Sequence, residues 1–202
     1  MYLKSVDGKI LFEGRFSNVR QGVEQAVEKN VDLTFVDLRA ANLSGAQMDR
    51  AQMPYACLWG ANLNGANMAE GNFKEADFRT ANFLDTCLAE ADCSDANFDG
   101  SYFSRTILTH SNLQRAQFSC PSIFTTDLSH TATMQGAIYS HLGEVDCDLS
   151  HAPLIIQGLP KPVIFMDDCL LIGSEYKKIA LREIVLAAIL EQEPIKNMII
   201  NQ

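Results

Sequence analysis

The sequence has no long apolar run, since none of its apolar stretches approaches the ~18 residues that a membrane-spanning helix needs. Residues 1–14 lack a long apolar core, so we expect no cleaved signal peptide and a cytoplasmic protein. The six cysteines include no CxxC pair, and they are spread along the chain without a metal-ligand spacing. This pattern predicts reduced thiols rather than a disulfide framework or a metal site.

Basic residues are in the minority, with 16 Lys and Arg against 25 Asp and Glu and a net charge of −9. This balance disfavours unaided binding to nucleic acid or to an anionic membrane. The sequence also lacks a phosphate-binding loop and a nucleophile paired with a base. We therefore expect a protein that is not an enzyme, uses no cofactor and acts on a protein partner.

The sequence does contain a strict five-residue period. A large residue, nearly always apolar, returns at every fifth position from Leu33 to Leu128, usually with a small residue two positions before it and Asn, Asp or Gln between them. The large positions are Leu33, Leu38, Leu43, Met48, Met53, Leu58, Leu63, Met68, Phe73, Phe78, Phe83, Leu88, Cys93, Phe98, Phe103, Leu108, Leu113, Phe118, Ile123 and Leu128. A fixed short period over this length indicates a repeat architecture.

A period of five fits neither an α-helix nor a strand whose side chains alternate between two faces. It fits a chain that turns a corner every five residues and buries two of the five side chains. Four such sides form a coil of about twenty residues, and coils would stack at the strand spacing of about 4.8 Å. The backbone hydrogen bonds of each coil then go to the coils on either side of it, as in other solenoids.

The repeats resemble the pattern Ala-(Asp/Asn)-Leu-X-X of the pentapeptide-repeat proteins. The clearest matches are Ala41-Asn42-Leu43, Ala61-Asn62-Leu63, Ala76-Asp77-Phe78, Ala81-Asn82-Phe83 and Ala96-Asn97-Phe98. The resemblance implies an all-β solenoid, a right-handed quadrilateral parallel β-helix of about six coils, here with N-terminal and C-terminal helical caps. It also implies candidate partners, because the quinolone-resistance members bind DNA gyrase or topoisomerase IV and their acidic rods are proposed to imitate duplex DNA.

The register of the period slips by one residue after Leu128. We interpret this as one inserted residue near 129–133, followed by a sixth coil. The segment 141–145 matches the period poorly and predicts a local loop. The β-helix is accordingly assigned to residues 31–154.

Residues 1–30 are expected to cover the first coil. Asp7-Gly8 is a hairpin signal ahead of the apolar run at 10–12. Ser17 is a candidate N-cap for a helix over about 18–29, whose Val and Ala side chains share one face.

Residues 155–202 differ from the repeats. Short strands are expected at 155–156, 163–166 and 170–172, followed by a helix over 174–193 that ends before Pro194. This helix is apolar nearly all round, so it either packs on the last coil or makes a homodimer contact. The candidate dimer-contact residues are Ile184, Val185, Ala188 and Ile189.

Acidic residues concentrate on two neighbouring sides of the expected coil. The candidate partner-binding residues on these sides are Asp49, Glu70, Glu75, Glu90, Asp92 and Asp95. They form either a solvated surface or a docking face for a basic groove. The repeats from 33 to 128 contain no insertion, so the projecting loops of some topoisomerase-protecting members are missing from that stretch.

Two functions follow from the sequence. In the first, the acidic rod is a protein-binding module that docks on a basic groove as a DNA mimic, with a type II topoisomerase as its partner. In the second, the rod is a spacer in a structural or regulatory adaptor that acts through its C-terminal segment as a homodimer.

Overall fold

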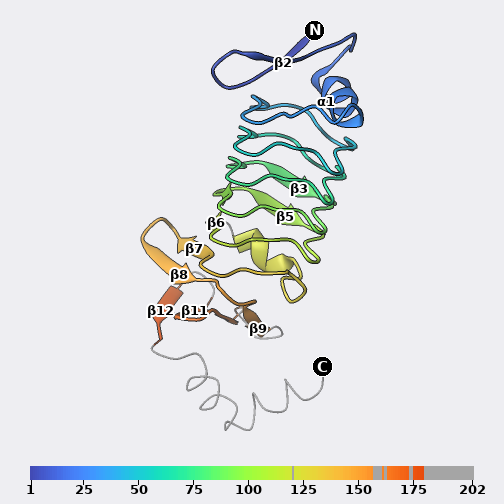
Figure 1. The fold of residues 1–202 in the computed structure, drawn as a ribbon. Helices are drawn as coiled ribbons and strands as arrows, with labels where there is room; N and C mark the ends of the chain where they lie inside the picture. The colour runs from blue at the N-terminus through green and yellow to red at the C-terminus, as the bar shows by residue number, and fades with distance from the viewer. Residues whose placement is uncertain (120, 157–160, 162, 173–174, 180–202) are drawn as a thin grey trace.

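The computed structural model describes residues 1–119, 121–156, 161, 163–172 and 175–179. Successive turns of the chain stack on one another in these residues (Figure 1). Parallel bridges join residues twenty apart, such as Asp32 with Gln52 and Asn42 with Asn62. The amide of Leu33 donates to the carbonyl of Gln52 at 2.8 Å, and equivalent bonds recur at each turn. The five-residue period predicted from the sequence therefore sets the backbone pairing.

The core runs along the axis of this stack. The large positions are fully buried, and so are most of the small ones, because the small side chain lets the backbone approach the axis. Phe78, Phe98 and Phe118 stack on one another with ring centroids 5.1 Å apart. Phe83 and Phe103 form a parallel stack at 5.0 Å. The large residues of successive turns thus make one continuous core.

The polar residue of each repeat forms hydrogen bonds at a corner of the coil. The Oδ1 atom of Asn62 accepts from the amide of Asn64 at 3.1 Å, and the amide of Ala46 donates to the carbonyl of Leu43 at 3.0 Å. Such side-chain bonds two residues along the chain are typical of Asn and Asp in turns. The corner residue itself often has a left-handed φ, for example +60° at Tyr55 and Glu90.

A few segments of the stack are regular enough to form strands. β3 (Asn82–Leu84) pairs with β5 (Tyr102–Ser104), and β4 (Asn97–Phe98) pairs with β6 (Gln117–Phe118), in both cases in parallel. The 3-10 helix η1 (Pro121–Thr125) follows β6.

The inserted residue predicted near 129–133 is confirmed, because the pairing distance along the sequence rises from 20 for Asp92–Asn112 to 21 for Asn112–Thr133. β7 (Ile138–His141) keeps this spacing and pairs in parallel with β6. The loop predicted at 141–145 is also present as a turn. The predicted continuous sixth coil is absent, because β8 (Val145–Asp148) folds back antiparallel to β7.

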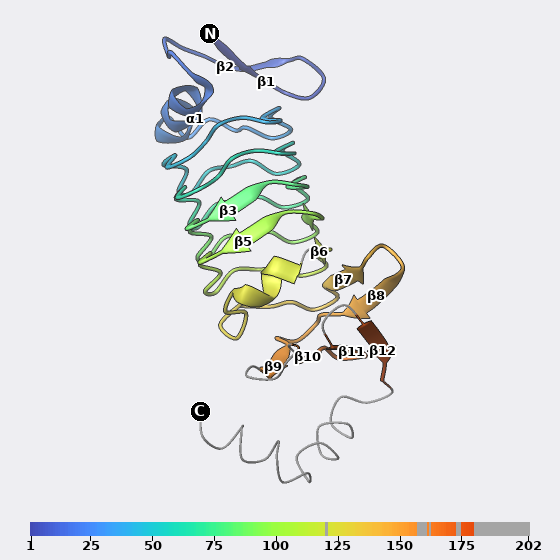
Figure 2. The same ribbon diagram turned by 180° about the vertical axis from the view of Figure 1, so that it is seen from behind.

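The N-terminal segment lies at one end of the stack (Figures 1 and 2). β1 (Tyr2–Lys4) and β2 (Ile10–Glu13) form the predicted hairpin, and α1 spans Val19–Glu28. The predicted N-cap was wrong by one residue. Asn18, not Ser17, accepts from the amide of Gln21, while Ser17 donates to the Gln21 side chain.

An antiparallel sheet lies at the opposite end of the stack (Figure 2). The strand order is β12-β11-β10-β9. The strands are β9 (Leu154–Ile156), β10 (Val163–Phe165), β11 (Cys169–Ile172) and β12 (Glu175–Lys178). The first three match the predicted strands.

The helix predicted over 174–193 is wrong at its start, because 175–178 pair with β11 and this pairing overrides the helical pattern. The remainder of that helix lies outside the described residues. None of the described helices is long and apolar enough to cross a membrane.

Candidate functional site

The six candidate partner-binding acids lie on the outside of the stack. Asp49, Glu70, Glu75 and Glu90 are exposed, whereas Asp92 and Asp95 are half-buried. Glu70, Glu75, Glu90 and Asp95 occupy corner positions with φ between +57° and +61°, which turn their side chains outward. The structure therefore places all six on the surface, as the sequence predicts, but it gives them different surroundings.

Two of the six acids are neutralised by arginines of adjacent turns. Arg50 donates to both carboxylate oxygens of Glu70 at 3.0 and 3.2 Å, and Arg115 donates to both oxygens of Asp95 at 2.5 and 2.6 Å. The hydrogen bonds from these arginines are the largest effect and lower the pKa of both Glu70 and Asp95. The positive charge of each arginine acts in the same direction, and desolvation opposes it. Each pair contributes little net charge to the surface.

The same arrangement recurs around the rod. Arg39 bonds to Asp37, Arg79 to Asp77 and Arg105 to Asp85, so all five arginines of residues 31–150 are held by a carboxylate. Two residues of sequence separation, or twenty, place each arginine beside its acid. The charge count alone does not indicate this pairing.

Glu75 and Asp92 are held by polar neighbours. Glu75 accepts from the hydroxyl of Tyr55, which raises the pKa of Tyr55, and its carboxylate lies 4.0 Å from the ammonium of Lys74. Asp92 accepts from the side-chain amide of Asn112 at 2.9 Å and from the amide of Ser94 at 3.0 Å. Both carboxylates therefore help to stabilise the corners of the coil.

Asp49 and Glu90 remain as the carboxylates of this set that have no hydrogen bond or ion pair to another described residue. They lie on the same side of the coil, two turns apart. Of the predicted residues, these two can give both charge and hydrogen-bond acceptors to a partner without breaking an internal contact.

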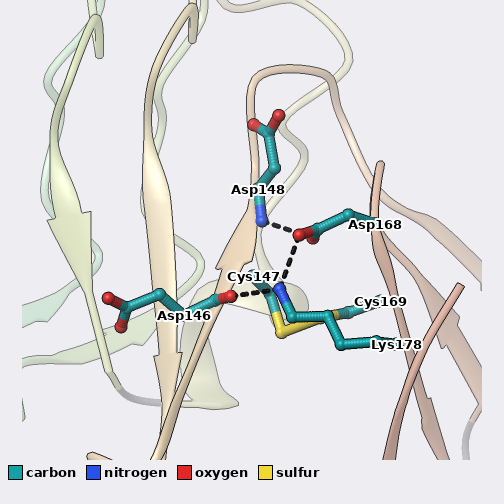
Figure 3. Close-up of a disulfide and its surroundings, with 6 residues drawn as sticks. All are labelled: Asp146, Cys147, Asp148, Asp168, Cys169 and Lys178. Atoms are coloured by element: carbon teal, nitrogen blue, oxygen red, sulfur yellow. Dashed lines mark hydrogen bonds and ion pairs between the residues drawn. A yellow bond between two sulfur atoms is a disulfide. The ribbon is translucent and has the colours of Figure 1, made fainter. Parts of the chain in front are cut away.

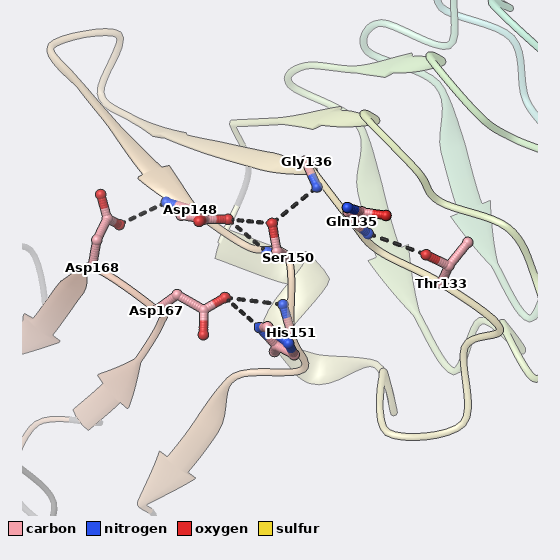
Figure 4. A network of polar contacts seen from close by, with 8 residues as sticks. All are labelled: Thr133, Gln135, Gly136, Asp148, Ser150, His151, Asp167 and Asp168. Carbon is pink, nitrogen blue, oxygen red and sulfur yellow. Dashed lines mark hydrogen bonds and ion pairs between the residues drawn. The ribbon is translucent and has the colours of Figure 1, made fainter. Parts of the chain in front are cut away.

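A second group of acids lies at the junction between the stack and the C-terminal sheet (Figure 4). Asp168 accepts from the amide of Asp148 at 2.7 Å, and Asp167 accepts from the amide of His151 and contacts its Nδ1 atom, both at 3.0 Å. Ser150 links this group to the stack by accepting from the amide of Gly136 at 2.9 Å. These carboxylates therefore fasten the sheet to the rod. Sequence reasoning missed this group, although the paired acids at 146, 148, 167 and 168 were a visible signal.

Cys147 of β8 and Cys169 of β11 form a disulfide beside the same junction, with their Cα atoms 5.6 Å apart (Figure 3). The prediction of reduced thiols is wrong for this pair, because the fold brings together two cysteines that are 22 residues apart in sequence. Cys57, Cys87 and Cys93 are free, and burial raises the pKa of Cys93.

The sulfurs of Cys147 and Cys169 also lie within 4.8 Å of a carboxylate oxygen of Asp168 and of each other. This is the one group of three such ligand atoms in the described part of the chain. The arrangement does not fit a metal ion, because the sulfurs are bonded to each other and Lys178 donates to Asp168 at 2.5 Å. The ammonium group already supplies the positive charge at this point.

The repeats match a known family. Residues 32–69, 55–85 and 86–119 match the family model described as pentapeptide repeats, in eight copies. Residues 32–119 are pentapeptide repeats. The resemblance drawn from the sequence is thereby confirmed, and the pentapeptide-repeat segment carries all six candidate acids. No curated protein matches the sequence.

Solved structures of pentapeptide-repeat proteins are similar to this chain. One, from the thylakoid lumen of Arabidopsis thaliana, has 20% identity and a TM-score of 0.34 over 70% of this chain and 75% of its own. HetL, involved in heterocyst differentiation regulation in Nostoc sp. PCC 7120, has 22% identity and a TM-score of 0.26 over 60% and 47%. QnrB1, a plasmid-mediated fluoroquinolone resistance protein, has 14% identity and a TM-score of 0.25 over 55% and 63%. The match spans less than two thirds of HetL and of QnrB1.

The four candidate dimer-contact residues, Ile184, Val185, Ala188 and Ile189, lie outside the described residues.

Proposed function

We propose that this protein is a non-catalytic, cytoplasmic protein-binding module whose acidic side docks on a basic groove of a protein partner. The observation that carries the proposal is that Asp49 and Glu90 share one side and have no partner among the described residues. A rod with free carboxylates on one side presents charge to a groove while its remaining acids hold the coil together. Such a contact would be electrostatic and would weaken as salt is added.

The proposed partner is a type II topoisomerase, DNA gyrase or topoisomerase IV, on which the rod would act as a DNA mimic. This partner follows from the resemblance of the repeats to those of the quinolone-resistance pentapeptide proteins. The same resemblance is the basis for a right-handed quadrilateral rod with a cap at each end. In this reading, residues 1–30 and 155–202 flank a repeat domain at 31–154.

A supercoiling assay tests this proposal. The purified protein should inhibit DNA gyrase at low salt and lose that effect at moderate salt. The double variant Asp49→Asn with Glu90→Gln should need at least a tenfold higher concentration for the same effect. Glu144→Gln, which removes an exposed acid from the β7–β8 turn, is the matched control and should behave as the wild type. Inhibition that is unchanged by the double variant would reject the acidic side as the contact.

The alternative function is a structural or regulatory adaptor that acts through its C-terminal segment as a homodimer. The pairing of all five arginines of residues 31–150 with acids favours the adaptor, because it leaves less free charge on the sides of the coil. A variant with Ile184→Ser and Ile189→Ser should then be monomeric and lose partner binding. The double variant Asp49→Asn with Glu90→Gln should remain dimeric and keep partner binding. Sedimentation of the two variants separates the functions.

A further inference from the structure

Each turn of the stack bonds to the turn before it through the same three backbone groups on every side. The amide of Asn62 donates to Ala41 at 2.9 Å, and its carbonyl accepts from Leu43 at 2.8 Å. The carbonyl of Pro54 likewise accepts from the amide of Phe35 at 3.0 Å. In the first turn the equivalent groups have no earlier turn to bond with, so the N-terminal segment has to supply their partners.

The N-terminal segment supplies partners on three sides of the first turn. The carbonyl of Lys4, at the end of β1, accepts from the amide of Asp37 at 2.8 Å. Two side chains of α1 reach the next two sides. Arg20 donates to the carbonyl of Ser44 at 2.9 Å, and Glu24 accepts from the amide of Gln47 at 3.1 Å.

On each of these three sides one of the three equivalent groups is bonded, whereas on the fourth side none of them has a partner among the described residues. Within the described residues, the amide and carbonyl of Asp32 and the carbonyl of Thr34 have no hydrogen-bond partner. Asp32 corresponds to Gln52 in the next turn, and Thr34 corresponds to Pro54. They form a short strand edge with one donor and two acceptors aimed away from the stack.

An apolar groove of about 750 Å³ lies over this open edge, between it and the β1–β2 hairpin. Its walls include Val6, Ile10 and Phe35, residues that are 51%, 50% and 51% exposed. The amide of Val6 bonds to the carbonyl of Phe35 at 2.9 Å, so the hairpin side of the groove is fixed to the stack. Apolar walls beside unpaired backbone groups are the features that capture an extended peptide as an added strand.

The charges at the rim favour a basic peptide. Asp7 and Asp32 line the groove and Lys9 is the one ammonium among its lining residues, so the rim carries a net negative charge. Asp32 is held by the amide and hydroxyl of Thr34, and Asp7 by the hydroxyl of Ser5. Hydrogen bonding lowers the pKa of both carboxyls, so they are ionised at neutral pH.

We propose that this end of the rod binds an extended segment of a protein partner, which adds as a strand to Asp32 and Thr34. One apolar side chain of the segment enters the groove between Val6, Ile10 and Phe35, and flanking Lys or Arg residues face Asp7 and Asp32. The segment's amides donate to the two free carbonyls, and its carbonyl accepts from the amide of Asp32. This site is separate from the acidic side at Asp49 and Glu90 and does not depend on it.

Fluorescence anisotropy with a labelled heptapeptide of alternating Lys and Val tests the proposal on the full-length protein. We expect saturable binding, and at least tenfold weaker binding of the same peptide with N-methylated valines, because these lack amide donors. A Glu and Val peptide should also bind at least tenfold more weakly. Absence of saturable binding at millimolar protein, or equal affinity for either of these two peptides, would overturn the proposal.

The matched variants are Ile10→Asp, inside the groove, and Ile107→Asp, at a similarly exposed position (49%) on the side of the coil. Ile10→Asp should weaken binding at least tenfold, and Ile107→Asp should not change it. The amide of Asp32 should exchange with solvent rapidly in the free protein and at least tenfold more slowly in the complex. Unchanged exchange, or a concentration-dependent dimer that Ile10→Asp abolishes, would show that the peptide is not the occupant.

Discussion

At the scale of single residues, the stability of the rod depends on the aromatic stack along its axis. Phe98 lies between Phe78 and Phe118, with ring centroids 5.1 Å away on each side, and it also contacts Phe83 and Phe103. Its side chain is fully buried. A smaller side chain there would leave a cavity that the neighbouring turns cannot close, because each is fixed by backbone bonds.

We therefore expect Phe98→Ala to lower the free energy of unfolding by about 3–5 kcal/mol, as measured by urea denaturation. Phe98→Leu, which fills most of the volume, should cost clearly less. A loss below about 1 kcal/mol for the alanine variant would contradict a closely packed axis.

The paired carboxylates predict acid sensitivity. The hydrogen bonds from Arg115 hold the pKa of Asp95 below its usual value in the folded state. A carboxyl with a lowered folded-state pKa stabilises the fold above its unfolded-state pKa of about 3.9, and that contribution is lost as the pH falls through the folded-state value. The free energy of unfolding should therefore decrease below about pH 4.

The variant Asp95→Asn should show a smaller decrease than the wild type between pH 5 and pH 2 in urea titrations at each pH. Asp49→Asn is the control, because no described residue pairs with that carboxylate, and its decrease should equal that of the wild type. An equal decrease in both variants would show that the Arg115 pair does not contribute.

The residue-scale features differ in how far the sequence predicts them. The burial of Leu33 or Phe98 follows from the five-residue period alone. The pairing of Arg50 with Glu70 also follows once residues twenty apart are placed side by side. The rotation of Arg39 and Arg79 toward Asp37 and Asp77 does not, because each arginine could equally contact the neighbouring turn and only side-chain geometry decides.

At the scale of elements, α1 depends on its N-cap residue, Asn18. Asn18 accepts from the amide of Gln21 and satisfies one of the free donors that begin a helix. We expect Asn18→Ala to cost about 0.5–2 kcal/mol of stability, measured by thermal or urea unfolding. Ser17→Ala should cost less, since that hydroxyl contacts a side chain and no amide of the helix. The reverse order would restore Ser17 as the N-cap.

The C-terminal sheet depends on the Cys147–Cys169 disulfide. A crosslink across 22 residues is expected to stabilise by about 3 kcal/mol, chiefly by restricting the unfolded chain. Reduction with dithiothreitol, or the double change of both cysteines to serine, should lower the free energy of unfolding by that order. Cys57→Ser should have no such effect. A wild-type protein that unfolds identically with and without the reductant would contradict this role.

The elements at the two ends were predicted unequally. The hairpin follows from Asp7-Gly8, α1 follows from the face that Val and Ala side chains share over 18–29, and β9 to β11 follow from short apolar runs. β12 did not follow, because its residues are helical by local preference and become a strand only by pairing with β11. The disulfide could not be predicted either, since the sequence does not indicate that β8 turns back toward the sheet.

At the scale of the whole molecule, the net charge of −9 overstates the charge that a partner would meet. Five acids of residues 31–150 form ion pairs with arginines, and the predicted docking side keeps few free carboxylates. The neutralisation of acids by arginines can be tested, because an arginine can be substituted while its acid is kept.

The double variant Arg50→Gln with Arg115→Gln frees Glu70 and Asp95 and takes the net charge from −9 to −11. If the acidic sides dock on a basic groove, inhibition of gyrase should strengthen and become more dependent on salt. Lys161→Gln, on a cation outside the rod, is the control. Weaker inhibition by the double variant would indicate that the ion pairs themselves form the contact.

The twenty-residue spacing of the backbone pairing also has a genetic consequence. A tandem duplication of sixty nucleotides within the repeats would add one turn, lengthen the molecule by about 4.8 Å and leave every existing surface facing its former direction. A duplication that does not add a whole number of turns would rotate one half against the other, whereas the single extra residue before Thr133 is absorbed locally and the parallel pairing continues beyond it. Descendants of this gene can therefore change in length by whole turns while both ends, with their separate contacts, are inherited intact.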